Sequence, residues 1–303
     1  MESSPFFTIF IPVYNRANTI ERLLKSIERQ TFRDFECIII NDGSKDDSEK
    51  VINSLKKKLD FKLRYYYQEN SGKHVARNKA LDLAKGKMFF SIDSDDVMMS
   101  DCLQLLFDSW LPVDNNKEFA GVEGNCLEYG SSKIIGQEFP NKLFDSDHIS
   151  TRYTHEIKGD KIRCILTSVF KEHKFPVYEN EKFIPESTVW NRIGKAYKMR
   201  YINHALAQVE YQKDGISSNS LKFRTENSLG SFNYYKEFLI FFSQDKRVKK
   251  KYIYKNSVNY YRFGLHNKMT LKKLFVVKEK NILEFPLILL GMLTYIRDKK
   301  KLR

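Results

Sequence analysis

Hydrophobic and polar positions alternate in blocks along the first hundred residues. Three runs, 6–11, 35–40 and 63–67, are rich in β-branched or aromatic residues, which is typical of strands buried in a sheet. Apolar residues recur at helical spacing after the first two runs, namely Ile20, Leu23, Leu24 and Ile27, then Val51, Ile52, Leu55 and Leu59. Such alternation predicts an α/β fold with a parallel sheet and right-handed crossovers.

Polar residues follow each predicted strand. The first strand is expected to stop at Pro12, and the second ends in Asn41, Asp42 and Gly43. The third leads through a glycine loop into a helix. In open α/β sheets, ligands bind outside the carboxyl ends of the strands. We therefore expect Tyr14, Asp42, the loop 71–77 and Asp93 to Asp96 to converge there.

The stretch MFFSIDSDD (88–96) carries the most specific chemistry, because a short strand runs into Asp93, Asp95 and Asp96. Carboxylates this close repel one another unless a cation or hydrogen-bond donors compensate. Hard oxygen ligands suit Mg²⁺ or Mn²⁺, which usually complete their coordination with waters and substrate phosphates. The motif predicts a diphosphate substrate. The alternative is a solvated turn in which Asp96 or Ser100 caps a helix at 101–110.

The segments IPVYNR, INDGSKDDS, NSGKHVARNKAL and SIDSDD occur in this order within the first hundred residues. Together they resemble the N-terminal half of the family-2 inverting glycosyltransferases. The resemblance implies the GT-A fold, a Rossmann-like and mostly parallel sheet flanked by helices. It also implies a nucleoside diphosphate sugar donor, commonly UDP-linked, and transfer that inverts the anomeric carbon with Mn²⁺ or Mg²⁺ as cofactor.

The resemblance also assigns roles to individual residues. Tyr14 resembles the residue that lies against the base, and Asp42 the one that hydrogen-bonds the base or ribose. Their alternatives are a packed aromatic and a turn residue. The basic cluster after Gly72 is expected to face the donor, with a solvated helix face as its alternative. The expected donor-binding residues are Pro12, Tyr14, Asn15, Arg16, Asp42, Gly72, Lys73, His74, Arg77, Asp93, Ser94 and Asp95, and the expected metal ligands are Asp95 and Asp96.

Inversion requires a base that takes the proton of the attacking hydroxyl. The segment 182–203 resembles the acceptor-side region of the family, where an acidic pair opens a helix. Pro185 occupies the first acidic position here, so Glu186 is the expected base. Glu179 and Glu181 are nearby competitors. The alternative for Glu186 is an acid that is favourable at a helix N-terminus.

Net charge separates the C-terminal region from the rest. Residues 246–303 contain 17 Lys and Arg against three acidic residues, a difference equal to the net charge of +14 of the whole chain. The apolar run 282–296 is interrupted by Glu284 and Pro286 and is short for a membrane span of about 20 residues. Followed by basic residues, it predicts an interfacial helix on an anionic membrane. The alternative is a helix packed on the catalytic domain or on a second subunit.

These observations predict a GT-A catalytic domain at 1–220 and a basic helical region at 221–303. Residues 1–100 are expected to bind the nucleotide sugar and 101–220 the acceptor. Asp214 and Ser217 are further candidate contacts, with a surface turn as the alternative. Four widely spaced cysteines without a Cys-x-x-Cys pair indicate reduced thiols, and no signal peptide is visible. The expected location is therefore the cytoplasmic face of the cell membrane.

The predicted function is transfer of a sugar, from a donor expected to be UDP-linked, to a saccharide or lipid-linked oligosaccharide acceptor in surface polysaccharide synthesis. The chain lacks the Gln-x-x-Arg-Trp pattern of processive synthases, which favours transfer of one or a few sugars. A nucleotidyltransferase would need a basic glycine-rich loop that IPVYNRANT lacks. A sugar-nucleotide-binding protein without transfer activity is a second alternative. No nucleic-acid module is recognised, and an oligomer through the C-terminal helices is left open.

Overall fold

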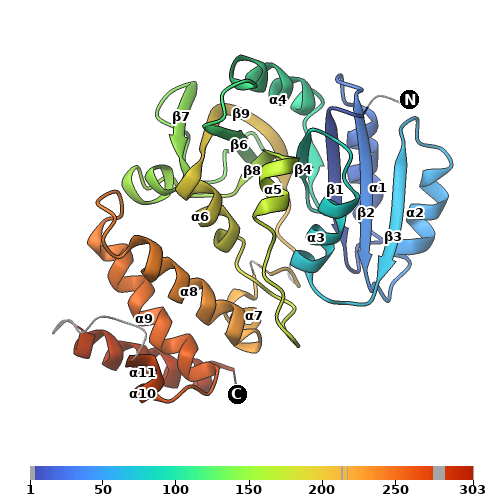
Figure 1. Cartoon of the computed structure of the whole chain (residues 1–303). Helices are drawn as coiled ribbons and strands as arrows, with labels where there is room; N and C mark the ends of the chain where they lie inside the picture. Colours follow the sequence, from blue (N-terminus) through green and yellow to red (C-terminus); the bar gives the residue numbers. More distant parts are fainter. Residues whose placement is uncertain (1–3, 213, 217, 276–283, 303) are drawn as a thin grey trace. The chain divides into compact units, whose positions relative to one another are not determined.

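The computed structural model describes residues 4–212, 214–216, 218–275 and 284–302 (Figure 1). Packing divides the chain into two compact units. The first comprises residues 1–175 and 192–212, and the second comprises residues 176–191 and 213–303. Ser217 and the start of the C-terminal apolar run, 282–283, lie outside the described residues. The division of function between 1–220 and 221–303 stays a prediction.

A mixed β-sheet forms the centre of the first unit. The strands in the described chain are β1 (Phe7–Val13), β2 (Phe35–Asp42), β3 (Leu63–Gln68), β4 (Met88–Ser91), β5 (Val97–Met98), β6 (Phe119–Glu128), β7 (Leu143–Asp147), β8 (Lys161–Leu166) and β9 (Lys198–Val209). Their order is β3-β2-β1-β4-β8-β6-β9-β5, and β7 pairs with β9. The four N-terminal strands are parallel, as predicted, whereas β8 pairs antiparallel to both β4 and β6. The α/β fold is confirmed, but the parallel arrangement is confined mainly to the N-terminal half.

Helices cover this sheet (Figure 1). They are α1 (Ile20–Glu28), α2 (Ser48–Lys56), α3 (Lys73–Leu83), α4 (Cys102–Trp110), α5 (Thr167–Glu172) and the short η1 (Leu111–Val113) and η2 (Ser150–Thr154). The four apolar positions that predicted α1 are all buried, and those of α2 are buried or packed against the core. Hydrophobic periodicity therefore located these two helices correctly.

One prediction about the strands is confirmed and another is wrong. Every residue of β2 is buried, including Cys37, as its continuous apolar run predicted. Pro12 does not stop β1, which continues to Val13. Since β4 pairs with β1 only through Phe10, Pro12 lies beyond the end of β4 and pairs with Ile40 of β2 alone. The amide hydrogen that proline lacks is therefore not needed on the β4 side.

Helices make up the second unit. They are α7 (Ser220–Glu226), α8 (Ser228–Phe242), α9 (Lys250–His266), α10 (Leu271–Phe275) and α11 (Glu284–Lys301), while α6 (Ser187–Ala196) contributes residues to both units. Four apolar residues at helical spacing along α8, Phe232, Tyr235, Leu239 and Phe242, are all buried. Trp190 is buried as well, which agrees with a core role rather than a sugar-binding one.

One face of α11 packs on α9. Asp298 is fully buried and accepts hydrogen bonds from Arg262 Nη2 at 2.7 Å and from the His266 ring at 3.0 Å. Gly291 allows close approach, because a Cβ there would lie 2.7 Å from Cβ of Tyr261. The C-terminal helix therefore packs on α9 of the same unit along this face, whereas packing on the catalytic domain or on a second subunit stays a prediction.

The other face of α11 exposes large apolar side chains, which are Phe285, Leu289, Leu290, Leu293 and Ile296. Phe285 is the most exposed of them, at 75%. No helix among the described residues has the length and the hydrophobicity that crossing a bilayer requires. The exposed face of α11 is thus apolar but belongs to a helix that also packs on protein.

Candidate functional site

The acidic cluster lies in the segment between β4 and β5. Asp93, Asp95 and Asp96 each offer a carboxylate oxygen, and these oxygens lie within 4.8 Å of one another. Ser94, between them, is buried. Helix α4 is preceded by Asp101 and has no side-chain cap, so the expectation that Asp96 or Ser100 caps this helix is wrong. Three convergent carboxylates form a donor set that fits a hard divalent cation such as Mg²⁺ or Mn²⁺.

The electrostatics of the cluster agree with this donor set. Burial, followed by the neighbouring charges of Asp93 and Asp95, raises the pKa of Asp96 to about 8. Burial also raises the pKa of Asp95, with Asp93 adding to the shift and Arg16 opposing it. Neighbouring carboxylates that cannot all ionise freely are the arrangement that a bound cation relieves.

Two basic residues singled out in the sequence contact this cluster. Arg16 Nε lies 3.1 Å from Asp95 Oδ2, and both side chains are largely buried. Lys73 Nζ lies 2.6 Å from one carboxylate oxygen of Asp93 and 2.9 Å from the other. Arg16 comes from the loop after β1, and Lys73 is the first residue of α3. The carboxyl ends of β1 and β4 and the start of α3 therefore converge, as expected from the sheet topology.

Asp42 lies at the end of β2 and organises the loop that precedes α3. Its carboxylate accepts hydrogen bonds from Gln68 Nε2, the Ser71 amide and the Gly72 amide, each at 2.8 Å. The side chain is almost completely buried. Gly72 has φ +96°, a backbone conformation that favours glycine. Asp42 thus holds the Gly72 loop in place, and its expected contact with a base or ribose stays a prediction.

The loops after β1 and β2 are joined side by side. The Asn15 amide donates to Ser44 Oγ at 3.0 Å, and the Lys45 amide donates to Asn15 Oδ1 at 2.8 Å. Asn15 has φ +52°, which Asn tolerates better than most residues. Pro12 is partly buried, while Tyr14 is 44% exposed. Tyr14 is thus not a buried core aromatic, and its ring remains accessible beside two anchored loops.

Two further predicted residues lie on the buried side of α3. His74 is almost completely buried, and neither ring nitrogen makes a hydrogen bond with the described residues. Burial lowers its pKa to about 4, with the Asp42 charge opposing that shift. Arg77 is also buried, donates to Ser91 Oγ at 3.3 Å and lies over the ring of Phe175. A solvated helix face, the alternative interpretation of these two residues, is therefore wrong.

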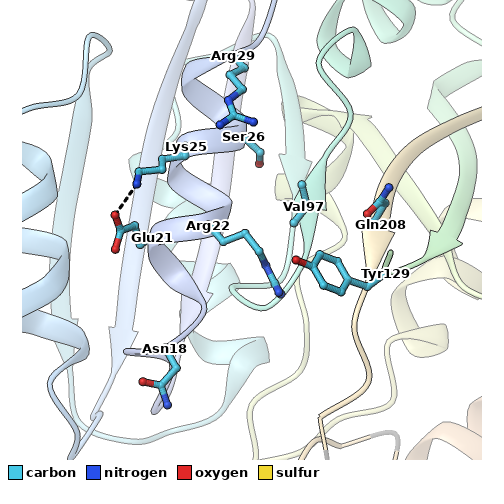
Figure 2. A pocket seen from close by; sticks show the side chains of 9 residues that line it. All are labelled: Asn18, Glu21, Arg22, Lys25, Ser26, Arg29, Val97, Tyr129 and Gln208. Atoms are coloured by element: carbon cyan, nitrogen blue, oxygen red, sulfur yellow. Dashed lines mark ion pairs between the residues drawn. The ribbon is translucent and has the colours of Figure 1, made fainter. Parts of the chain in front are cut away.

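An open hollow of about 570 Å³ lies along the face of α1 that carries Arg22, Lys25 and Arg29 (Figure 2). Figure 2 shows Lys25 paired with Glu21 and the Arg22 side chain extended toward Tyr129. The Arg22 guanidinium lies 4.0 Å from the centre of the Tyr129 ring. The hollow therefore has three cationic side chains and one carboxylate on a single helix.

Arg22 also links this hollow to the acidic cluster. Its Nη2 donates to the backbone carbonyl of Asp95 at 2.5 Å and to Glu210 Oε2 at 2.7 Å. The backbone of Glu210 in turn opposes the rise in the pKa of Asp96. Neither Arg22 nor Glu210 was predicted from the sequence, because the two residues lie 188 positions apart and no local pattern pairs them. Only the polar position of Arg22 between apolar helix positions was visible in the sequence.

The expected base, Glu186, belongs to the second unit. It directly precedes α6, and its backbone carbonyl accepts from Val189 at 3.0 Å. Glu181, a competitor for that role, is engaged elsewhere, since its two carboxylate oxygens accept from the amides of Leu229 and Gly230 at the start of α8. Asp214 lies in an exposed turn, in agreement with the surface-turn interpretation.

Residues 8–115 match the model of the family described as Glycosyl transferase family 2. This segment runs from β1 past α4 and includes the acidic cluster with both of its basic neighbours. The chain is also 29% identical over 270 residues to GalNAc(5)-diNAcBac-PP-undecaprenol beta-1,3-glucosyltransferase of Campylobacter jejuni, across 86% of this chain and 82% of that protein. Some relatives are longer, and the match spans 31% of the glycosyltransferase GlyA of Streptococcus pneumoniae.

Solved structures with the same fold include two sugar-nucleotide complexes. TarS 1–349 of Staphylococcus aureus with UDP-GlcNAc has a TM-score of 0.55 and 18% identity, over 96% of this chain and 81% of that chain. The mannosyltransferase PcManGT of Pyrobaculum calidifontis, with GDP-Man and Mn²⁺, has a TM-score of 0.57 and 14% identity, over 98% and 89%. The likeness confirms the α/β fold of the GT-A class that the four motifs implied.

Proposed function

We propose that this chain, which belongs to glycosyltransferase family 2, transfers a sugar from a UDP-linked donor to a saccharide acceptor. The observation that carries the proposal is the acidic cluster of Asp93, Asp95 and Asp96 with Arg16 and Lys73 in contact with it. Carboxylates for a divalent cation beside side chains that pair with phosphate are the groups a nucleoside diphosphate requires. The fold of the neighbouring strands brings all five residues to one edge of the sheet.

Each part of the donor has a candidate partner in the first unit. Tyr14 offers an accessible ring for the base, beside the anchored loops after β1 and β2. Asp95 and Asp96 would hold Mn²⁺ or Mg²⁺, which supplies charge stabilisation for the leaving diphosphate. Arg16 and Lys73 would pair with phosphate oxygens. Asp42 and Gly72 keep the loop before α3 in a shape that leaves Lys73 directed at this edge.

The proposed reaction is a single displacement with inversion. The acceptor hydroxyl attacks the anomeric carbon, the bond to the diphosphate breaks, and Glu186 takes the hydroxyl proton. Glu186 is preferred over Glu181, because both carboxylate oxygens of Glu181 are used by the amides at the start of α8. In this role Glu186 would act as a general base rather than only as a favourable charge at the start of α6.

We also propose that the acceptor is a lipid-linked oligosaccharide presented at an anionic membrane. The Campylobacter jejuni relative is named for a polyprenol-diphosphate-linked acceptor. Within the second unit, α11 carries an exposed apolar face, Phe285 to Ile296, followed by exposed Arg297, Lys299 and Lys300. An apolar stripe that ends in basic residues suits an anionic bilayer surface. Synthesis of a surface polysaccharide would use such an acceptor.

The test compares Glu186→Gln and Asp95→Ala with the unchanged protein. Turnover is measured as UDP release from UDP-sugars in Mn²⁺ with a polyprenol-linked saccharide acceptor, and UDP binding by calorimetry. We expect Glu186→Gln to retain UDP binding and to lose at least about 100-fold in turnover, the usual contribution of a general base. We expect Asp95→Ala to lose Mn²⁺-dependent UDP binding.

Two controls separate this function from its alternatives. Glu179→Gln, a neighbouring carboxyl change, should leave turnover near the unchanged level. Donor binding without turnover toward any tested acceptor would favour a binding protein, and formation of a UDP-sugar from a sugar phosphate and UTP would favour a nucleotidyltransferase. Unchanged turnover in Glu186→Gln would remove Glu186 from the mechanism.

A further inference from the structure

Two cationic side chains from separate elements occupy carboxylate oxygens of the acidic cluster. Arg16 Nε contacts Asp95 Oδ2 at 3.1 Å, and Lys73 Nζ contacts both oxygens of Asp93 at 2.6 and 2.9 Å. The Arg16 and Asp95 side chains are only 17% and 15% exposed, so solvent screens this pair weakly. The contact between Arg16 and Asp95 therefore differs from an ordinary ion pair at a solvated surface, whereas Lys73 pairs with the more exposed Asp93.

The same contacts conflict with a bound divalent cation. Mg²⁺ binds carboxylate oxygens at about 2.0–2.1 Å. An ion held by Asp95 and Asp96 would consequently share the Asp95 carboxylate with Arg16, and it would lie beside the Asp93 carboxylate that pairs with Lys73. Like charges this close repel one another strongly in a partly buried site. The two side chains and the metal ion thus compete for the carboxylates of one cluster.

The backbone that carries Arg16 is held independently of Asp95. The backbone amide of Arg16 donates to Ser48 Oγ at 2.8 Å. The Arg16 side chain also donates from Nη1 to the backbone carbonyl of Asn15 at 2.9 Å. Lys73 is likewise held by its backbone, because the adjoining Gly72 amide is bound by Asp42. Either side chain can therefore leave its carboxylate and still remain beside the cluster.

We propose that Arg16 and Lys73 are exchangeable counter-ions, which neutralise Asp95 and Asp93 in the ligand-free protein and move to the diphosphate when nucleotide and divalent cation bind together. This inference rests on the proposed function, since it takes the ligand to be a nucleoside diphosphate with a metal ion. The cation alone then binds weakly. Nucleotide and cation strengthen each other's binding, and by the same factor in both directions.

The experiment is a Mn²⁺ titration of the full chain followed by electron paramagnetic resonance, with and without UDP. For the unchanged protein we expect UDP to tighten Mn²⁺ binding at least about tenfold, within the usual range of coupling between sites. Arg16→Gln and Lys73→Met should each bind Mn²⁺ alone about tenfold more tightly than the unchanged protein. UDP should also tighten Mn²⁺ binding by a smaller factor in each variant than in the unchanged protein.

Matched variants separate exchange from a structural role. Arg16→Lys keeps the charge and should leave Mn²⁺ binding without UDP weak. Arg33→Gln breaks the exposed pair with Asp60 ahead of β2 and should change neither titration. Thermal unfolding of each variant shows whether it folds. If Arg16→Gln does not fold, Lys73→Met alone provides the test.

Two results separate failure of this inference from failure of the proposed function. Mn²⁺ affinity without UDP that is unchanged or weaker in both folded variants, while UDP still tightens it in the unchanged protein, would overturn the inference alone. Absence of UDP binding to the unchanged protein, with or without Mn²⁺, would refute the proposed function itself.

Discussion

At the scale of single residues, burial gives three aspartates of one motif three different environments. Asp93 is 45% exposed and paired with Lys73. Asp95 is largely buried and paired with Arg16. Asp96 is buried, and the charges of Asp93 and Asp95 add to the effect of burial in raising its pKa. The residue type is the same at all three positions, so only the surroundings separate a solvated carboxylate from one that holds a proton near neutral pH.

The raised pKa of Asp96 predicts a pH dependence of stability. Its folded-state pKa of about 8 lies above the value of about 3.9 for an exposed Asp. The folded protein therefore binds more protons than the unfolded chain between these values, and this contribution to stability is lost as the pH rises toward 8. In EDTA, we expect the unfolding temperature to decline less from pH 5 to pH 8.5 in Asp96→Asn than in the unchanged protein.

A neighbouring aspartate provides the control for that measurement. Asp101→Asn removes an exposed carboxyl just ahead of α4 and should leave the pH profile unaltered. Identical slopes for Asp96→Asn and the unchanged protein would mean that Asp96 is ionised in the folded state well below pH 8.

At the scale of elements, the contact between α9 and α11 rests on a buried charge. Asp298 is fully buried and is paired with Arg262 and His266. Burial lowers the pKa of His266, while the Asp298 charge opposes that shift. Removing one member of a buried pair leaves an uncompensated charge, which costs more than the pair contributes.

Asp298→Ala should therefore loosen α11. We expect a loss of about 3–5 kcal/mol in the free energy of unfolding of the second unit, the range for a broken buried pair. Hydrogen exchange followed by mass spectrometry should show faster exchange across α11 than in the unchanged protein. Glu226→Ala, which breaks the exposed pair with Lys222, is the control and should have little effect. Unchanged protection of α11 would mean that apolar packing alone holds it.

At the scale of the whole molecule, the basic residues and the exposed apolar face belong to the same region of the chain. Residues 246–303 account for the net charge, and α11 exposes Phe285, Leu289, Leu293 and Ile296. These four positions lie within about 100° of one another around the helix at 3.6 residues per turn. The inferred membrane surface is therefore one face of one helix rather than the tail in general.

Sedimentation with vesicles tests that surface. We expect the full chain to bind vesicles containing anionic lipid and to bind much less at high salt or to zwitterionic vesicles. Leu289→Gln with Leu293→Gln should reduce binding at least about tenfold, because each buried methylene contributes about 0.8 kcal/mol. Ile240→Gln changes an equally exposed apolar residue of α8 and should have little effect. If the double variant still binds vesicles, the exposed face of α11 is not the membrane surface. If the double variant instead changes its oligomeric state, this face binds a second copy of the chain.

Agreement between sequence and structure was greatest where the signal is local. Strands β1 to β4 and helices α1 and α2 follow from the hydrophobic pattern, and the end of β1 was misplaced by only one residue at Pro12, whereas the short β5 was not predicted. The strands from β6 to β9 were not predicted individually. Their pairings are antiparallel and parallel in turn and join residues far apart in the chain, which no local pattern encodes.

The sequence by itself determined the main strands and helices of the first hundred residues, the family resemblance and the acidic motif, because periodicity and motif spacing are properties of neighbouring residues. Tertiary structure alone decided which groups meet at the cluster. Arg16 reaches Asp95 across 79 positions, and Arg22 reaches Glu210 across 188. Pairing of β1 with β4 closes the first of these distances, and pairing of β9 with β5 beside α1 closes the second. Packing around the cluster then sets the burial of each carboxylate.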